Sequence, residues 1–475
     1  MKDLVLSLSV MAILWGGCTQ PPQKVTWVTS SPDSTWQSKE LDVMNNAEEP
    51  EDSVIVIAPE RRQQVIDGFG GAFNELGWEA LDMVSESKRE EILTALFDGK
   101  QGADFNMGRI SIGANDYAVD WYSHNETKND FNMEQFSIDR DKKRLIPYIK
   151  AAREYNSDLK IWASPWCPPT WMKKNNHYAC DPDSVNDLPE EGAGRQKDGL
   201  PVESQFRMQE KYLSAYALYF SEFVKAYDKA GIDIYMVQPQ NEPNSCQNFP
   251  SCLWTPSDLA TFIGEYLGPK FEEEGLDTEI WLGTIERPQV ERVSAIVEDE
   301  EAGKYIEGVG FQWGGKGAIP GVNEKYPDMK LIQTETECGD GSNDWEAAEY
   351  TYSLMKHYFN NGANSYMYWN MVLDETGDSQ WGWKQNSMIS IHSKTKEVAY
   401  NPEYYLMKHF GHFIEPSSYK IGASDENTLA FRKDETVIVI YHNDGNTAEK
   451  HFIVGDKQFT AEVAARSFNT FKLRI

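Results

Sequence analysis

The sequence has little positive charge and, beyond its first residues, no long apolar run. Each shortage excludes a class of protein. Asp and Glu number 75 against 45 Lys and Arg, which gives a formal net charge of −30. Nucleic acids and anionic membranes bind basic patches, so neither is expected as a partner of this chain. No segment after residue 18 is long and apolar enough to form a transmembrane helix.

Cysteine and histidine are also scarce. The chain has 6 cysteines and 8 histidines, and their spacings match no zinc pattern. Neither a Gly-x-Ser-x-Gly nucleophile turn nor the histidine pair of a metalloprotease is present. We therefore expect chemistry without a metal ion or cofactor. Cys246 with Cys252 and Cys167 with Cys180 are candidate disulfide pairs, but the sequence does not decide the pairing.

Residues 1–18 have the pattern of an export signal. Lys2 is followed by an apolar core, 4–15, that is too short to remain in a bilayer as a spanning helix. Gly16-Gly17-Cys18 resembles the cleavage site of bacterial lipoproteins, after which the cysteine carries a lipid. We expect an exported protein, periplasmic or at the cell surface if Cys18 is lipidated and secreted otherwise. That lipid would be the chain's attachment to a membrane.

Aromatic residues, in contrast, are abundant. The chain has 15 Trp and 23 Tyr, and its hydrophobic content of 40% excludes a disordered polypeptide. Sugars present flat apolar faces ringed by hydroxyl groups, and an aromatic side chain offers an apolar platform with a polar edge. Most of these rings are expected to lie in the core, yet their number also suits a protein that binds carbohydrate.

Short apolar runs recur from residue 64 onwards, with helical periodicity between most of them. Eight such runs predict an α/β fold, a (β/α)8 TIM barrel that spans residues 64–414. An open, doubly wound sheet is the alternative, disfavoured by the lack of a phosphate loop. The predicted strands are 64–72, 106–112, 160–166, 234–240, 279–284, 308–313, 330–334 and 365–371. The clearest predicted helices are 87–97, 140–155, 209–229, 256–274 and 342–359.

The pattern changes again after residue 414. Residues 415–475 contain short alternating strands with turn signals between them, which is typical of a β-sandwich. Strand-like runs at 25–28 and 53–58 lack partners in the barrel. We therefore expect residues 19–63 to be a tether whose strands complete a discontinuous β-sandwich domain, with 31–52 as a loop. The predicted C-terminal strands are 428–432, 436–441, 450–454, 459–463 and 467–473.

Two glutamates lie where predicted strands stop. An apolar run leads into Asn241-Glu242-Pro243, and Pro243 biases Glu242 away from a helical conformation. Glu335 ends a second such run, with Glu337 as a rival two residues later. The C-terminal ends of barrel strands surround the active site, so strands four and seven would bring Glu242 and Glu335 to one cavity.

A pair of carboxylates about 5 Å apart can hydrolyse a glycoside with retention of configuration. One attacks the anomeric carbon and the other protonates the leaving oxygen. We predict Glu335 as the nucleophile and Glu242 as the acid and then the base, with the Asn241 amide on the sugar 2-hydroxyl. An inverting hydrolase is one alternative, and a non-catalytic carbohydrate-binding protein on the same scaffold is another.

Five motifs resemble those of glycoside hydrolase family 30, the family of glucosylceramidases and β-1,6-glucanases. The resemblance covers residue 64 to the C-terminus. The motifs are Ile66-Asp67-Gly68-Phe69-Gly70-Gly71-Ala72-Phe73, Ala163-Ser164-Pro165-Trp166-Cys167-Pro168-Pro169-Thr170-Trp171-Met172, Asn241-Glu242-Pro243, Trp369-Asn370 and His409-Phe410-Gly411-His412-Phe413.

The resemblance implies roles for further residues. It gives Glu242 as acid/base and Glu335 as nucleophile, in agreement with the strand-end argument. Arg109, inside the second predicted strand, is expected to orient the carboxylates through charge-assisted hydrogen bonds. The residues that match family contacts to the sugar are Asp116, Trp166, Asn241 and Trp369.

The chain departs from the glucosylceramidase pattern at the sixth predicted strand. Those enzymes carry His-Trp-Tyr there, whereas this chain has Gln312-Trp313-Gly314. Together with Trp381 and Trp383, which are able to stack on a glucan, this favours a retaining β-1,6-glucanase acting on β-glucan. A glucosylceramidase of sphingolipid metabolism remains the alternative. The loops 181–203 and 314–317 are expected at the same end of the barrel.

Overall fold

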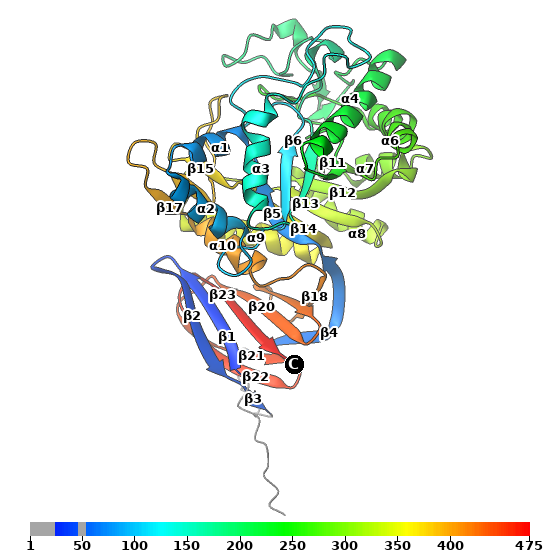
Figure 1. Ribbon diagram of the computed structural model, residues 1–475. Coiled ribbons are helices and arrows are strands. Elements are labelled where there is room, and N and C mark those ends of the chain that lie inside the picture. Colours follow the sequence, from blue (N-terminus) through cyan, green and yellow to red (C-terminus); the bar gives the residue numbers. More distant parts are fainter. Residues whose placement is uncertain (1–23, 46–53) are drawn as a thin grey trace, which may run out of the picture.

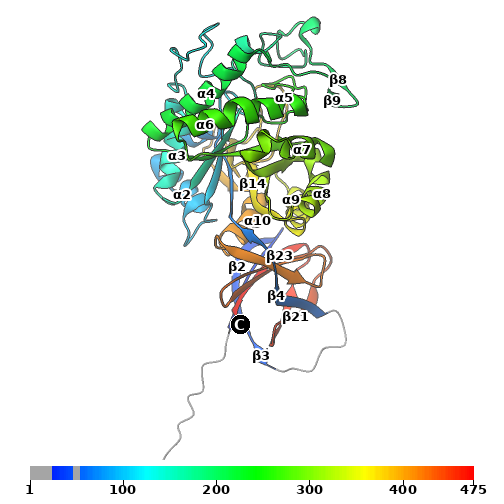
Figure 2. The same cartoon turned by 90° about the vertical axis from the view of Figure 1, so that its right-hand side faces the viewer.

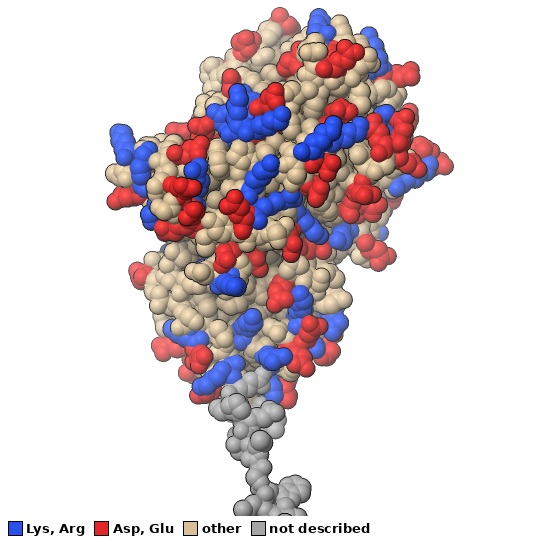
Figure 3. All heavy atoms as spheres, in the orientation of Figure 1, with Lys and Arg blue, Asp and Glu red and all other residues tan. Residues whose placement is uncertain are grey.

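The computed structural model describes residues 24–45 and 54–475, in two parts (Figure 1). A barrel with its helices forms one part, and a β-domain that contains both the first described strands and the C-terminus forms the other. The expected export signal, including Cys18, lies outside the described residues. On the face shown in Figure 3, Lys and Arg side chains are interspersed with Asp and Glu.

Within the described residues, eight parallel strands close into a barrel in the order β10-β11-β12-β13-β14-β5-β6-β7. The predicted fold class is confirmed, and closure excludes the open sheet. Each predicted strand is present, although the first is divided because residues 64–66 belong to β4 of the other domain. The barrel strands are β5 (Gly68–Ala72), β6 (Met107–Ser111), β7 (Lys160–Ser164), β10 (Ile234–Val237), β11 (Glu279–Ile285), β12 (Ile306–Gln312), β13 (Lys330–Glu335) and β14 (Ala363–Asn370).

Helices surround the barrel (Figure 2). The predicted helix 256–274 is broken by a π-helical turn, Phe262–Leu267, and begins at a Thr255 cap whose hydroxyl accepts from Asp258 N–H. The predicted helix 140–155 is a 3₁₀ turn, Asp141–Lys143, followed by α3. The helices are α1 (Glu75–Asp82), α2 (Glu86–Phe97), α3 (Leu145–Arg153), α4 (Glu210–Lys229), α5 (Pro256–Thr261), α6 (Gly268–Glu274), α7 (Val290–Val297), α8 (Ile319–Lys325), α9 (Trp345–Asn360) and α10 (Pro402–Gly411).

The β-domain is discontinuous, as predicted. Its first strands pair with C-terminal ones: β1 with β23, and β4 with β18 and β21. Phe471 of β23 contacts Phe452 of β21 and Phe459 of β22, with ring centroids 4.7 and 5.0 Å away, so the sheet folds over itself around a core. The strands are β1 (Lys24–Ser31), β2 (Ser34–Asp42), β3 (Met44–Asn45), β4 (Val54–Ile66), β18 (Ser418–Ala423), β19 (Thr428–Lys433), β20 (Thr436–Asn443), β21 (Ala448–Val454), β22 (Lys457–Val463) and β23 (Ser467–Arg474).

The prediction of a loop at 31–52 is wrong for residues 34–42, which form β2. This strand pairs with β1 alone and lies at one edge of the sheet. Most of its side chains are exposed, so the apolar alternation that would have revealed a strand is missing. Its hydrogen bonds to β1 hold it in place, and its Trp36 ring also packs against His409, His412 and Phe413.

Short elements cover the end of the barrel that carries the C-terminal ends of its strands. A small sheet follows β14, and the β8–β9 hairpin lies within the expected loop 181–203. These strands are β8 (Gln196–Lys197), β9 (Leu200–Pro201), β15 (Val372–Asp374), β16 (Ile389–Ile391) and β17 (Val398–Tyr400). The remaining 3₁₀ turns are Thr170–Met172, Glu190–Gly192, Ala302–Lys304 and Trp313–Gly317.

His409 of α10 joins the two domains. Its ring nitrogens lie 2.9 Å from Ser30 Oγ of β1 and 2.8 Å from Thr470 Oγ1 of β23. Burial lowers the pKa of His409 to about 3, so the ring is neutral at this interface.

All five cysteines of the described chain are free thiols. Neither pairing considered from the sequence is formed. Cys180 instead lies against Cys246, whose thiol hydrogen bond lowers the pKa of Cys180 to about 5. Across residues 24–45 and 54–475, no helix has the length and apolar character needed to cross a membrane, and no three His, Cys, Asp or Glu side chains are arranged to hold a metal ion.

The barrel interior is built in two layers. The lower layer is an apolar cluster to which six of the strands contribute one residue each: Met107, Trp162, Met236, Trp281, Ile332 and Met367. Side chains alternate along a strand, so the residue two positions later faces the interior again. In this second layer the residues are largely polar, namely Arg109, Ser164, Gln238, Thr334 and Trp369. The apolar floor therefore supports a polar layer directly beneath the cavity.

Candidate active site

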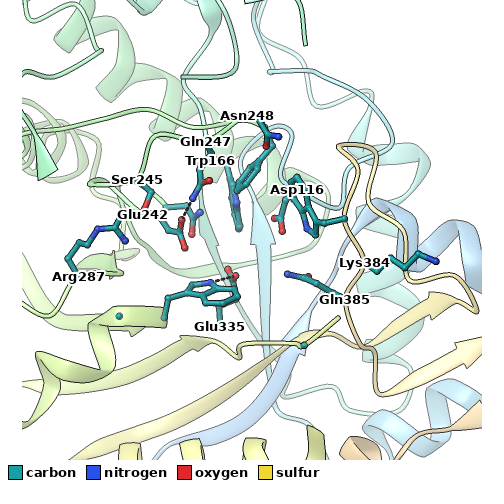
Figure 4. Close-up of a pocket in the computed structure, with 16 residues that line it drawn as sticks. Asp116, Trp166, Glu242, Ser245, Gln247, Asn248, Arg287, Glu335, Lys384 and Gln385 are labelled. Carbon is teal, nitrogen blue, oxygen red and sulfur yellow. Dashed lines mark hydrogen bonds between the residues drawn. The ribbon is translucent and has the colours of Figure 1, made fainter. Parts of the chain in front are cut away.

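The two predicted catalytic glutamates reach one cavity from different strands (Figure 4). Glu335 is the last residue of β13, as expected. β10 ends at Val237, however, so Glu242 lies beyond the strand and not at its tip. The intervening segment still follows its neighbour in the barrel, because Asn241 N–H donates to Pro165 O over 2.7 Å.

Glu242 begins a tight turn with a left-handed backbone conformation, φ 48°. Its N–H donates to Thr284 Oγ1 of β11 over 3.2 Å, and its carbonyl accepts from Ser245 N–H at 3.0 Å. A non-glycine residue adopts this conformation only where its surroundings hold it there. The turn directs the Glu242 carboxylate into the cavity.

The cavity has a volume of about 630 Å³ and opens at the C-terminal ends of the barrel strands. Polar side chains and aromatic rings share its lining. Its lining comprises Asp116, Trp166, Asn241, Glu242, Ser245, Gln247, Asn248, Phe249, Arg287, Trp313, Gly314, Glu335, Gly339, Trp383, Lys384 and Gln385.

One amide group bridges the two glutamates. Gln312 Nε2 lies 3.0 Å from Glu242 Oε1 and 3.2 Å from Glu335 Oε2. The two carboxylate oxygens are therefore no farther apart than these two distances laid end to end. Gln247 Nε2 donates to the other oxygen of Glu242 over 3.2 Å, and Trp313 Nε1 donates to the other oxygen of Glu335 over 3.1 Å.

Arg109 lies beneath this pair, fully buried. Its Nη1 donates to Glu335 Oε2 at 2.9 Å, and its Nη2 donates to Asn241 Oδ1 at 2.7 Å. The guanidinium also contacts the faces of Trp166 and Trp369, whose ring centroids are 4.4 and 5.2 Å away. Arg109 thus hydrogen-bonds both the nucleophile candidate and the amide beside Glu242, and its role in orienting the two carboxylates stays a prediction.

Burial sets the protonation of the carboxyl groups. It raises the pKa of Glu335 to about 7; the Arg109 charge opposes this rise and the Glu242 charge adds to it. Burial also raises the pKa of Asp116 well above the usual carboxyl range, and the Glu335 charge adds to that rise. A group with a raised pKa keeps a proton near neutral pH more readily than a solvated carboxyl.

Two buried polar atoms at the cavity wall have no hydrogen-bond partner in the described chain. Asp116 Oδ1 belongs to a lining residue, and Trp369 Nε1 belongs to a residue just behind the lining. An unpaired buried polar atom is costly, so such atoms commonly bind a ligand or water. An acceptor and a donor near Glu242 and Glu335 provide what the hydroxyl groups of a sugar require.

Most residues predicted from the sequence meet at this cavity. Asp116, Trp166, Asn241, Trp313 and both glutamates line it. Gln312, Trp369 and Arg109 are buried behind the lining, and the Trp369 ring stacks on that of Trp166 with centroids 5.4 Å apart.

Trp381 and Glu337 lie outside the lining. Trp381 is only 3% exposed and packs edge-on against Trp121, so the structure does not place it on the sugar path. Trp383, which the sequence also singled out, lines the cavity instead. Glu337 pairs with Lys316 at 2.5 Å and accepts from Tyr350 Oη at 2.7 Å, away from Glu242.

The sequence analysis did not identify two groups of residues, those in the loop after Glu242 that line the cavity and those that directly follow β11. Gln247, Asn248 and Phe249 come from a loop whose position in space has no sequence signal. Glu286 and Arg287, by contrast, follow an apolar strand directly, as Glu335 ends one. That same pattern of polar residues at a strand end could have identified them.

Comparisons with known proteins agree with this geometry. The model of the glycosyl hydrolase family 30 TIM-barrel domain matches residues 66–414. The chain is 26% identical to the lysosomal acid glucosylceramidase of Mus musculus, over 82% of this chain and 77% of that protein. It is 25% identical to the endo-1,6-beta-D-glucanase BGN16.3 of Trichoderma harzianum, over 86% of this chain and 84% of that protein.

Among solved structures, SrfJ from Salmonella typhimurium superposes with a TM-score of 0.84, at 22% identity, over 95% of this chain and all of that one. At this identity the likeness shows the fold alone. The family model, in contrast, matches most of the chain and contains every barrel strand as well as both glutamates. The chain belongs to glycosyl hydrolase family 30, a family of glycosidases.

Proposed function

We propose that the protein is a retaining β-glucoside hydrolase that acts on β-1,6-glucan by double displacement. The observation that carries the retaining mechanism is the Gln312 amide between the two carboxylates. Its contacts of 3.0 Å to Glu242 and 3.2 Å to Glu335 keep the nearest oxygens closer than the roughly 6.5 Å at which inverting pairs begin. A separation below that limit supports retention, because an inverting pair must leave room for the attacking water molecule.

In the first step Glu335 attacks the anomeric carbon while Glu242 gives its proton to the leaving oxygen. The bond from the anomeric carbon to that oxygen breaks, and a glucosyl–Glu335 ester forms. Glu242, now a carboxylate, takes a proton from water, and the resulting hydroxide cleaves the ester with a second inversion. Asp116 Oδ1 and Trp369 Nε1 supply the unpaired acceptor and donor for the glucose hydroxyls.

The side chains around the cavity favour a glucan substrate over a lipid substrate. Rings of Trp313, Trp383 and Phe249 line the cavity beside the polar side chains of Arg287 and Lys384. Such a surface suits sugar rings, whereas the hydrocarbon tails of a ceramide need a contiguous apolar surface. In the described chain the exposed large apolar side chains lie outside the lining; they are Met44, Val56, Val185, Val202 and Tyr350.

Glucosylceramide is the second candidate substrate. It is favoured by the similarity to the mouse lysosomal acid glucosylceramidase, which slightly exceeds the similarity to the Trichoderma glucanase. The same two glutamates would cleave it, because the glucose unit and the bond are shared. The two substrates differ only in the leaving group that the rim must accept.

A parallel assay tests both proposals. Purified protein is incubated with pustulan, gentiobiose and glucosylceramide, and the anomer of the first product is read by NMR within minutes. We expect fastest turnover of the β-1,6-glucosides, with the β-anomer formed first. Faster turnover of glucosylceramide would reject the glucan, and an initial α-anomer would reject retention. No turnover of these or of any aryl β-glucoside would indicate a non-catalytic carbohydrate-binding protein.

A further inference from the structure

Glu286 is a third buried carboxylate beside the proposed catalytic pair. It follows β11 directly and is 1% exposed. Its Oε1 accepts from Asn244 N–H at 2.9 Å and from the Ser245 hydroxyl at 3.1 Å, and its Oε2 accepts from Asn244 Nδ2 at 3.2 Å. Ser245 lines the cavity but Glu286 does not, so Glu286 contacts the chain and not a substrate.

The residues that Glu286 binds form the end of the turn that starts at Glu242. The start of the turn is held by Thr284, two positions earlier on the same strand, whose hydroxyl accepts from Glu242 N–H and donates to Asn241 Oδ1 over 2.9 Å. Thr284 therefore binds the start of the turn, and Glu286 binds its end. A left-handed conformation such as that of Glu242 is strained for a residue other than glycine and persists only when neighbours hold it.

Charged side chains of both signs lie around Glu286. Burial raises its pKa to about 7; the Glu242 charge adds to the rise, and Arg287 opposes it. Arg292 of α7 also faces this cluster, because its Nε donates to Asn244 Oδ1 over 2.7 Å. The ionisable groups around Glu286 are thus Glu242 beyond β10, Arg287 next in the chain and Arg292 on the helix.

We propose that Glu286 is a positioning residue for proton transfer, which holds the 242–245 turn so that the Glu242 carboxyl faces the leaving-group oxygen. The inference rests on the proposed function, in which Glu242 is the acid. A carboxylate suits this position because it accepts from three donors and presents none. A glutamine would turn one of its own N–H groups toward a donor of Asn244 or Ser245. The turn would then shift, and the Glu242 carboxyl would move with it.

The test separates proton donation from every other step. A 2,4-dinitrophenyl glucoside has a leaving group that needs no protonation, whereas gentiobiose has a leaving group that does. In Glu286→Gln we expect kcat/KM for gentiobiose to fall by up to about 100-fold, the effect of a misplaced catalytic group. For the dinitrophenyl glucoside we expect little change in the step that forms the glucosyl-enzyme.

Two further variants make the result decisive. Glu242→Gln should show the same dependence on leaving group, only larger; if it does not, the proposed function itself fails. Asp141→Asn removes another fully buried carboxylate, which accepts from Tyr122 Oη and Tyr227 Oη outside the cavity lining. It should change kcat/KM for both substrates by the same factor, as a general loss of stability would.

The inference is overturned if Glu286→Gln lowers kcat/KM equally for gentiobiose and the dinitrophenyl glucoside while Glu242→Gln does not. Glu286 would then be a structural residue only. Should Glu286→Gln fail to fold, Glu286→Asp keeps the charge but withdraws the oxygens from Asn244 and Ser245. The same selective loss with gentiobiose is expected from it, and an unselective loss would again reject the role. Thermal unfolding of each variant shows that the folded protein is being compared.

Discussion

Arg109 Nη1 and Glu335 Oε2 form an ion pair at 2.9 Å, with the two side chains 0% and 6% exposed. The guanidinium lies among the buried carboxyl groups of Glu335, Asp116 and Glu242. It lies inside the barrel on β6, above the apolar layer, and its charge counteracts the rise that burial causes in the pKa of Glu335. Pairing with this buried cation therefore limits the rise in the pKa of the proposed nucleophile.

Replacing Arg109 with Met should damage both stability and catalysis. Removing one partner of a buried pair leaves the other charge uncompensated, at a cost of about 3–5 kcal/mol. We expect the free energy of unfolding in urea to fall by that amount and kcat/KM to fall by more than about 100-fold. Arg109→Lys keeps the charge but not the fork that reaches both Glu335 and Asn241, so its loss should be intermediate. Near-native activity in Arg109→Met would contradict the orienting role.

The two glutamates should give opposite results with azide. In Glu335→Gln no glucosyl-enzyme can form, so a fluorinated glucoside should no longer label the protein. Azide, which takes the place of the missing nucleophile, should then give α-glucosyl azide from an activated glucoside. In Glu242→Gln the ester still forms, and azide should give the β-product. Mass spectrometry and NMR read both outcomes; persistent labelling of Glu335→Gln would assign the nucleophile elsewhere.

Glu403 on α10 should make stability depend on pH. Burial raises its pKa to about 7, and it accepts from Asn386 Nδ2 at 2.7 Å. In the unfolded chain a glutamate loses its proton near pH 4.5, so the folded state binds more protons between about pH 4.5 and 7 and stability falls as pH rises through this window. Relative to Glu403→Gln, the wild type should lose about 3 kcal/mol between pH 4.5 and 8, measured by urea unfolding.

The comparison with the variant is needed because buried histidines act in the opposite direction. Burial lowers the pKa of His409, so the unfolded state binds protons that the folded state does not, and stability rises with pH up to about 6.5. This contribution is the same in both proteins and cancels in the difference. A difference that does not change with pH would show that Glu403 titrates normally.

The barrel and the proposed catalytic pair were predictable because each depends on a repeated local pattern. Short, continuous apolar runs give the barrel strands, and the polar residue at the end of a run gives Glu335. The same logic would have reached Glu286, which follows β11 directly. It reached Glu242 only in part, because the conformation of the turn after Val237 depends on Thr284 of β11, which is distant in sequence.

Other features could not be derived from local pattern. β2 carries mostly exposed side chains on an edge strand, so its sequence resembles that of a loop. Trp381 and Trp383 are two residues apart in equally polar surroundings, yet one is buried and the other lines the cavity. Their positions depend on how the loop after β15 packs against Trp121 and Phe249, which are distant in sequence.

Cys18 should determine where the protein is held in the cell. The pattern of residues 1–18 predicts cleavage before Cys18 and attachment of a lipid to it. We expect cells that express the full chain to incorporate labelled palmitate into the protein and to retain it in the membrane fraction. Cys18→Ala should lose the label, with the hydrolase domain otherwise intact. Incorporation that persists in this variant would place the lipid elsewhere.

Trp383 and Trp381 provide a matched pair for the leaving-group side of the cavity. The Trp383 ring lines the cavity and lies 4.9 Å from that of Phe249, centroid to centroid, whereas Trp381 is buried. Stacking on an aromatic ring is worth about 0.5–1.5 kcal/mol, so Trp383→Ala should raise KM for pustulan by about 2- to 12-fold with little change in melting temperature. It should leave KM for a small aryl glucoside nearly unchanged, because that substrate does not reach the rim.

Trp381→Ala should instead lower the free energy of unfolding by about 3–5 kcal/mol, as expected for a large core side chain. If Trp381→Ala selectively weakened pustulan binding without loss of stability, the sugar path would run past Trp381 as the sequence first indicated.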